Sequence, residues 1–199
     1  PVYTRQLAEF LLNFSKEFDQ VWIMPCFKHM FGKKMESPKH RLAMCRLATK
    51  HDRRIFVSDY EIKKKLGGET YYMVKNLLNE DVAKNERNFS IAMGMDNANT
   101  FDKWANYQDL ERIIRCVIIP RTGVEMLKNG WYLKPPHMLL IPEKPLLEIS
   151  STMVRGTLKE HWDVVLFHEV AQTSNCLDSP NFIHPDVLKY IQKNELYWE

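Results

Sequence analysis

The sequence Ile149-Ser150-Ser151-Thr152-Met153-Val154-Arg155-Gly156 places three hydroxyl groups and one arginine at an expected helix start. It follows Pro145-Leu146-Leu147-Glu148, which is typical of a short buried strand. Free backbone N–H groups at a helix start favour an anion. Arg155, about one turn later, can hold phosphate oxygens with its planar guanidinium. The simpler alternative is an ordinary Ser/Thr cap followed by a solvated arginine.

Working outward from this turn, short apolar runs alternate with segments of helical periodicity. We predict strands over 21–24, 54–57, 89–93, 115–119, 137–141 and 146–149, and helices over 7–18, 37–50, 71–78 and 185–194, with helical turns over 99–104 and 107–111. Thr70 is expected to cap the helix over 71–78. This alternation predicts an α/β fold, a Rossmann-like parallel sheet flanked by helices.

Polar sequences follow several of the predicted strands. They are 28–34, 58–59, 94–97, 121–123 and 150–155. In parallel sheets ligands bind at the carboxyl ends of the strands. We therefore expect these sequences to line one pocket.

Size and composition narrow the class of protein. The 199 residues predict a single domain over 1–199, with a small C-terminal helical part over about 150–199. The net charge of +3 argues against a nucleic-acid partner, and no apolar run is long enough to span a membrane. Four scattered cysteines, with no C-x-x-C pair, suggest reduced thiols and an intracellular reducing compartment. We expect the cytoplasm, or the mitochondrion if the N-terminus was processed.

Several motifs, in order along the chain, together resemble the nicotinate and nicotinamide mononucleotide adenylyltransferases, a nucleotidyltransferase family. They are Val21-Trp22-Ile23-Met24-Pro25, His40-Arg41, Gly68-Glu69-Thr70-Tyr71, Gly94-Met95-Asp96 followed by Phe101 and Trp104, Arg121-Thr122-Gly123, Ile149 to Arg155, and the tail from Tyr190-Ile191 to Leu196-Tyr197. The resemblance implies that ATP and a pyridine mononucleotide are joined into a dinucleotide with release of pyrophosphate.

The resemblance also implies roles for particular residues. Arg155 would be catalytic, and ATP would contact Ser150, Ser151, Thr152, Gly94, Asp96 and Lys33. The pyridine mononucleotide would contact Thr70, Tyr71, Trp104 and Arg121, with Trp104 stacked on the ring. Mg²⁺ would bridge phosphates with few protein ligands. The histidines are scattered, so we expect no metal site built by the protein itself.

The beginning of the chain departs from the family. The family opens with a strand and G-x-F-x-P-x-H-x-G-H, and aligned from Val21-Trp22 its two histidines fall on Tyr3 and Gln6, and a glycine on Arg5. Loss of one charge-stabilising donor typically costs about 10²–10³-fold in rate. The alternative is therefore a degenerate relative, a structural or nucleotide-binding subunit of a larger assembly, which would be mitochondrial if the N-terminus was processed. Its exposed N-terminal sheet edge would be covered by a protein partner.

Overall fold

The computed structural model describes residues 2–14, 16–30, 32, 34–82, 87–143, 146, 151–160 and 183–197. Contacts between Cα atoms divide the chain into two compact units. Unit 1 comprises residues 1–25, 36–59 and 147–199, and unit 2 comprises residues 26–35 and 60–146. Each unit is therefore assembled from segments that are distant in the sequence.

In unit 1 a pair of parallel strands is covered by the first helix. Strand β1 (Val21–Ile23) pairs with β2 (Ile55–Val57), with Val21 opposite Ile55. Helix α1 (Val2–Phe14) buries Ala8 and Leu12 against Ile55. Ala8, Leu11 and Leu12 lie at helical spacing, so one apolar stripe of α1 faces these strands.

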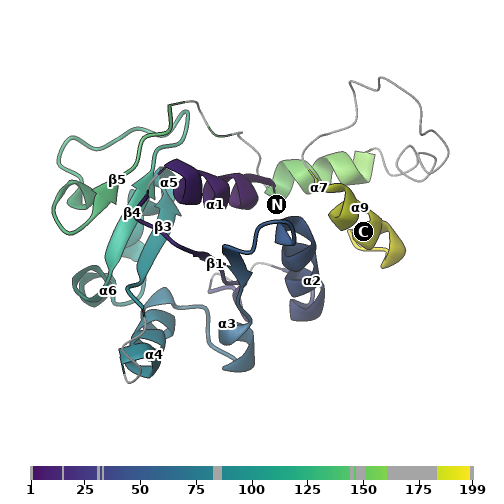
Figure 1. The fold of residues 1–199 in the computed structure, drawn as a ribbon, viewed down its shortest axis with the longest axis horizontal. Coiled ribbons are helices and arrows are strands. Elements are labelled where there is room, and N and C mark those ends of the chain that lie inside the picture. Colours follow the sequence, from purple (N-terminus) through teal and green to yellow (C-terminus); the bar gives the residue numbers. More distant parts are fainter. Residues whose placement is uncertain are drawn as a thin grey trace. The chain divides into compact units, whose positions relative to one another are not determined.

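Three further helices of unit 1 share a second apolar cluster. They are α2 (Pro38–Thr49), α7 (Ser151–Glu160) and α9 (Pro185–Lys193), drawn in blue, green and yellow in Figure 1. Leu158, Val187 and Ile191 form the centre of this cluster, and Met44 and Leu47 of α2 pack against it. The Oγ of Ser37 accepts a hydrogen bond from the N–H of His40 at 3.4 Å and so caps α2, with Pro38 in the first turn.

Unit 2 is built on three parallel strands, which lie side by side in Figure 1. Strand β4 (Arg115–Ile119) lies between β3 (Ser90–Gly94) and β5 (Met138–Leu139). The helices of this unit are α3 (Tyr60–Lys63), α4 (Thr70–Val82), α5 (Met95–Ala98) and α6 (Tyr107–Ile113), with 3₁₀ turns η1 (Phe101–Lys103) and η2 (Trp131–Leu133). Their core includes Val74, Phe101, Leu110, Ile118 and Tyr132, each at most 2% exposed.

The parallel pairing predicted from the sequence is confirmed, while several boundaries are wrong. Hydrogen bonds join the described strands in two sets, β1–β2 and β3–β4–β5. Helix α1 begins at Val2 rather than Leu7, and α4 continues to Val82. The expected strand over 137–141 shortens to Met138–Leu139, and residues 147–149 of the last expected strand lie outside the described residues. Within the described part of the chain, no helix is both long and apolar enough to cross a membrane.

Candidate functional site

The carboxyl ends of β3 and β4 bring two of the predicted site sequences together. The two strands are in register so that Gly94 lies opposite Ile119, and each strand ends there. Asp96 follows in the first turn of α5, and Arg121 follows Pro120 after β4. Their side chains meet, with Arg121 Nη1 3.5 Å from Asp96 Oδ2. The expected convergence is thus observed for these two sequences.

This ion pair lies at the protein surface. The Asp96 side chain is 47% exposed and that of Arg121 is 27% exposed. A carboxylate and a guanidinium here can bind complementary parts of a polar ligand. The carboxylate accepts hydrogen bonds from hydroxyl groups, and the guanidinium donates to phosphate or carboxylate oxygens.

Trp104 is held beside this sequence by a group of aromatic rings. Phe101 is buried, and its ring centroid lies 5.3 Å from that of Trp104. On Phe101 stacks Trp131, with ring centroids 4.2 Å apart and an interplanar angle of 20°. The Nε1–H of Trp131 donates to the carbonyl oxygen of Ala98 at 2.9 Å. Trp104 itself is half-buried and packs against the core, so both the structural and the ligand-stacking interpretation fit its position.

Trp131 and Tyr132 also support this site, although the sequence pattern did not indicate them. The Tyr132 hydroxyl accepts from the N–H of Leu127 at 2.9 Å and lies 3.4 Å from Asn99 Oδ1. Together the two rings fix the segment from α5 to η1 that carries Asp96 and Trp104. The available signal was the sequence Gly130-Trp131-Tyr132, an aromatic pair directly after a glycine, in a region with no helical or strand periodicity.

A tight turn precedes the pair Thr70 and Tyr71. Gly68 has a φ of +99°, and a Cβ at this position would collide with the carbonyl oxygen of Lys28. Helix α4 already includes Thr70, so Thr70 is a first-turn residue and the expectation that it caps the helix was wrong. Tyr71 is half-buried, packs against the core of unit 2 and has Lys75 Nζ 5.6 Å from its ring centroid.

The segment that carries the basic residues 28–34 is anchored at its start by a buried acid. Glu61 is 6% exposed, and its Oε1 accepts a hydrogen bond from the N–H of Phe27 at 3.2 Å. This contact and the Gly68 turn place Lys28 against the start of α4. Lys33 lies outside the described residues, so its predicted phosphate contact stays a prediction.

The hydroxyl- and arginine-bearing sequence belongs to unit 1. Helix α7 begins at Ser151, as expected from the sequence, and Thr152 is exposed in its first turn. Arg155 is half-buried, and its Nη2 donates to Thr152 Oγ1 at 3.5 Å. The two side chains thus lie on one face of α7 and can contact one anion together. Ser150 lies outside the described residues.

Tyr197 in the C-terminal turn lies in the electrostatic field of Arg155. Burial raises the pKa of the Tyr197 hydroxyl, and the nearby carboxylate of Glu36 raises it further, while Arg155 and Arg41 oppose this change. The positive charges of Arg155 and Arg41 therefore act in the same neighbourhood of unit 1.

Comparison with known proteins identifies the family. The cytidylyltransferase-like family model matches residues 8–157. A probable nicotinate-nucleotide adenylyltransferase of Bacteroides thetaiotaomicron is 32% identical over 192 residues, which cover 94% of this chain and 82% of that protein. A probable nicotinate-nucleotide adenylyltransferase of Myxococcus xanthus is 30% identical over 154 residues, which cover 76% of this chain and 73% of that protein. The chain therefore belongs to the cytidylyltransferase-like family and, within it, to the nicotinate and nicotinamide mononucleotide adenylyltransferases.

The fold agrees with this assignment. The Plasmodium falciparum nicotinic acid mononucleotide adenylyltransferase, solved in complex with NaAD, superposes with a TM-score of 0.74 at 19% identity. The superposition covers 98% of this chain and 90% of that one. The Rossmann-like nucleotidyltransferase fold predicted from the sequence is confirmed.

Proposed function

We propose that the protein is an adenylyltransferase of NAD biosynthesis, which joins ATP to nicotinate or nicotinamide mononucleotide. The phosphate of the mononucleotide attacks the α-phosphorus of ATP, the bond to the β-phosphate breaks and pyrophosphate leaves. The observation that carries the proposal is the meeting of Asp96 and Arg121 at the adjoining ends of β3 and β4. Both residues belong to sequences that resemble the motifs of this family.

The proposed roles follow from the chemistry of each side chain. Arg155, with Ser150, Ser151, Thr152 and the start of α7, would hold phosphate oxygens of ATP and stabilise charge on the leaving pyrophosphate. Gly94 would let the ATP ribose approach the backbone, and Asp96 would accept hydrogen bonds from the ribose hydroxyls.

The mononucleotide would be bound by a second group of side chains. Thr70 and Tyr71 would border the pyridine ring, Trp104 would stack on it, and Arg121 would face its phosphate. A base–aromatic stack contributes about 1–3 kcal/mol by analogy with nucleic-acid bases. Lys33 would contact a phosphate from its own segment.

ATP is normally bound with Mg²⁺, which supplies charge neutralisation at the phosphates. The carboxylate of Asp96 is a poor ligand for this ion, because it already faces the guanidinium of Arg121 at 3.5 Å. We therefore assign no protein ligand and no step to Mg²⁺.

The decisive experiment measures dinucleotide formation by Arg155→Ala. The purified chain is incubated with ATP and either mononucleotide, and the dinucleotide is quantified by chromatography. We expect turnover to fall about 10²–10³-fold, because a charge-stabilising donor is removed. The melting temperature should change little, because the hydrogen bond from Arg155 to Thr152 is exposed and long, at 3.5 Å. Arg53→Ala, an exposed arginine of the same unit, is the matched control. Equal turnover in both variants would remove Arg155 from the proposed site.

A specific observation favours the second candidate, a relative that binds nucleotide without turnover. Residues 3, 5 and 6 lie in α1, and Arg5 forms an ion pair with Glu9, with Nε to Oε1 at 3.3 Å. Gln6 occupies a position where the family has a histidine. Under this alternative, calorimetry detects ATP or dinucleotide binding while no dinucleotide is formed from either substrate. Dinucleotide formation at rates typical of enzymes would exclude it.

A further inference from the structure

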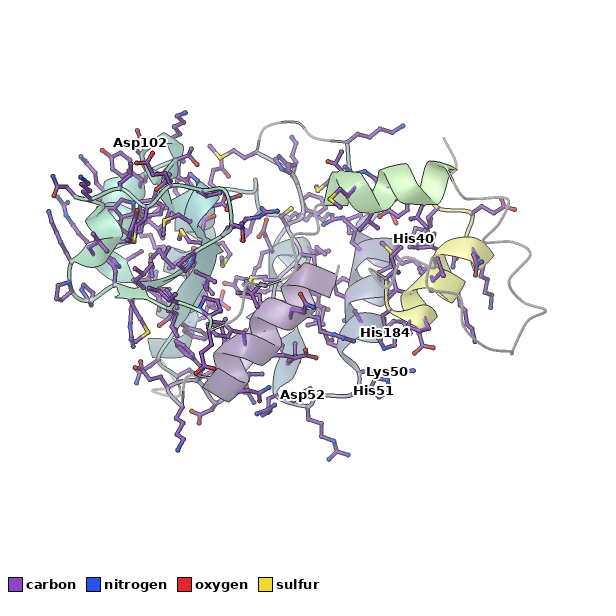
Figure 2. The ribbon with its side chains drawn as sticks, turned by 90° about the horizontal axis from the view of Figure 1, so that it is seen from above. His40, Lys50, His51, Asp52, Asp102 and His184 are labelled. Atoms are coloured by element: carbon purple, nitrogen blue, oxygen red, sulfur yellow. The ribbon has the colours of Figure 1, made fainter. Side chains whose placement is uncertain are left out.

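Two histidines and one carboxylate meet in unit 1, and none of the three has a role in the function proposed above. His51 follows the C-terminal end of α2, while His184 and Asp186 stand at the start of α9. One ligand atom from each of these three side chains lies within 4.8 Å of the others. Figure 2 shows His51 and His184 beside each other, next to Lys50. Their ring centroids are 5.7 Å apart with an interplanar angle of 28°.

Helix capping and helix packing set the positions of these three residues. His184 is the N-cap of α9, and its Nδ1 accepts the N–H of Asp186 at 3.2 Å, so Nε2 is the nitrogen that can face a metal ion. Val187 and Ile191 of α9 share an apolar cluster with Leu47 of α2. The three ligands therefore lie at the adjoining ends of two packed helices, His51 just after α2 and the other two at the start of α9.

We propose that His51, His184 and Asp186 bind one divalent transition-metal ion of the zinc class, which ties the end of α2 to the start of α9. Two imidazoles and a carboxylate suit Zn²⁺ and its neighbours in the first transition row better than Mg²⁺ or Ca²⁺. A water molecule completes the coordination, because His51 is exposed.

The geometry requires a modest side-chain adjustment. Ligand atoms around a tetrahedral Zn²⁺ ion lie about 3.4 Å apart, as follows from bond lengths near 2.1 Å. The potential ligand atoms of the three side chains lie within 4.8 Å of one another, so their separations can exceed this spacing. His51 is exposed and lies in the turn after α2, so its side chain can rotate toward the other two ligands when the ion binds.

Lys50 competes for the same carboxylate. Its Nζ lies 2.6 Å from Asp186 Oδ2. A bound metal ion would replace this ammonium group as the cation beside Asp186. Substitution of Lys50 should therefore raise the affinity of the site for the metal ion. Removal of a partly exposed ion pair corresponds to a change of about two- to fivefold in affinity.

The test is a titration of the full chain, freed of metal with a chelator, with Co²⁺ alone. We expect one equivalent to bind, visible absorption bands of a tetrahedral ion, and their disappearance on addition of Zn²⁺. His51→Ala and Asp186→Asn should each weaken binding at least tenfold. Lys50→Ala should strengthen it about two- to fivefold. His29→Gln, in unit 2, is the matched control and should leave affinity unchanged.

A second readout guards against unfolded variants. Zn²⁺ should raise the melting temperature of the wild-type chain and have no such effect on His51→Ala, whose circular dichroism should match wild type. Three results would each overturn the proposal. They are the absence of bands, charge-transfer bands typical of a thiolate ligand, and wild-type affinity in His51→Ala. An unchanged affinity in Lys50→Ala would refute the competition by Lys50. None of these outcomes depends on adenylyl transfer.

Discussion

Asp96 illustrates how little stability a site residue needs to contribute. Its ion pair with Arg121 joins two partly exposed side chains at 3.5 Å. Pairs of this kind contribute about 0–1 kcal/mol to the free energy of unfolding. The pair therefore orients two polar groups at the ends of β3 and β4 more than it holds the strands together.

Asp96→Asn should separate binding from stability. We expect the dissociation constant for ATP to rise at least about tenfold, because hydrogen bonds to a charged group contribute about 1.5–3 kcal/mol. The melting temperature should stay within the range of other surface substitutions. Asp102→Asn, an exposed acid on η1 that is labelled in Figure 2, is the control and should leave both quantities unchanged. Unaltered ATP affinity in Asp96→Asn would exclude Asp96 from the nucleotide site.

From the buried thiol of Cys116 we predict that the free energy of unfolding falls at alkaline pH. Burial in the core and, to a smaller extent, the carboxylate of Glu111 together raise the pKa of its thiol to about 12. Between about pH 9 and 12 the unfolded chain has lost this proton while the folded chain keeps it. The stabilisation is thus complete below about pH 9 and declines as the pH rises through this window.

The measurement is urea unfolding of wild type and Cys116→Ala at pH 8 and pH 10. The difference between their free energies of unfolding should shrink by about 1–2 kcal/mol over this interval. The reason is that the Cys116 thiol ionises in the unfolded wild-type chain but not in the folded one, and the variant lacks this thiol. The comparison cancels the titration of other groups. A difference that is constant with pH would show that the buried thiol ionises normally.

Local side-chain chemistry explains which single residues could be predicted. Ser is a preferred N-cap and Pro is favoured in the first turn, so Ser37 and Pro38 together indicate a helix start. The capping hydrogen bond from His40 N–H to Ser37 Oγ is present at 3.4 Å. The pairing of Asp96 with Arg121 could not be predicted from local sequence, because Asp96 follows β3 and Arg121 follows β4. Only the parallel pairing of β3 with β4 brings the two together.

At the scale of elements, apolar patterning located the strands that are most deeply buried. Strand β4 was predicted over its full length, and four of its five residues are buried. Strand β5 has two residues, and η2 is a single turn stabilised by Trp131 and Tyr132. Such short elements depend on contacts with distant residues, which periodicity does not record.

The turn before α4 gives a prediction for an element. Gly68→Ala should lower the free energy of unfolding by about 1–3 kcal/mol, because a left-handed φ of +99° and the Lys28 carbonyl both exclude a Cβ. Gly156→Ala in α7 is the matched control, since nothing lies within 4 Å of a Cβ there. It should stabilise the chain by up to about 1 kcal/mol. Chemical denaturation measures both, and equal effects would contradict this account of the turn.

At the scale of the whole molecule, the expectation of a single domain over 1–199 stays a prediction, as does the expectation that all the polar sequences line one pocket. The family resemblance extends over nearly the full sequence; the family model matches residues 8–157, and the Bacteroides thetaiotaomicron relative aligns with 94% of the chain. Which segments share a compact unit could not be predicted from periodicity, because unit 1 combines the first and last parts of the chain.

One hydrogen bond tests this long-range assembly. His40 Nδ1 on α2 lies 2.9 Å from the hydroxyl of Tyr190 on α9, which is 150 residues away in the sequence. Tyr190→Phe should lower the free energy of unfolding by about 0.5–1.5 kcal/mol. Tyr107→Phe is the control, because its hydroxyl contacts only Gln108 among the bonds described, at a weak 3.4 Å. Equal effects of the two substitutions in urea unfolding would show that the bond adds no stability.

Because unit 1 combines segments that are distant in the sequence, the two units cannot fold at the same stage of synthesis. Residues 60–146 form most of unit 2 and emerge as one continuous stretch, so that unit can close during synthesis. Helix α2 is synthesised much earlier than α9, although the two helices share an apolar cluster. A nascent chain halted before Pro185 therefore carries all of unit 2 and an apolar side of α2 that still lacks its contacts with α9, which is the kind of intermediate that chaperones retain.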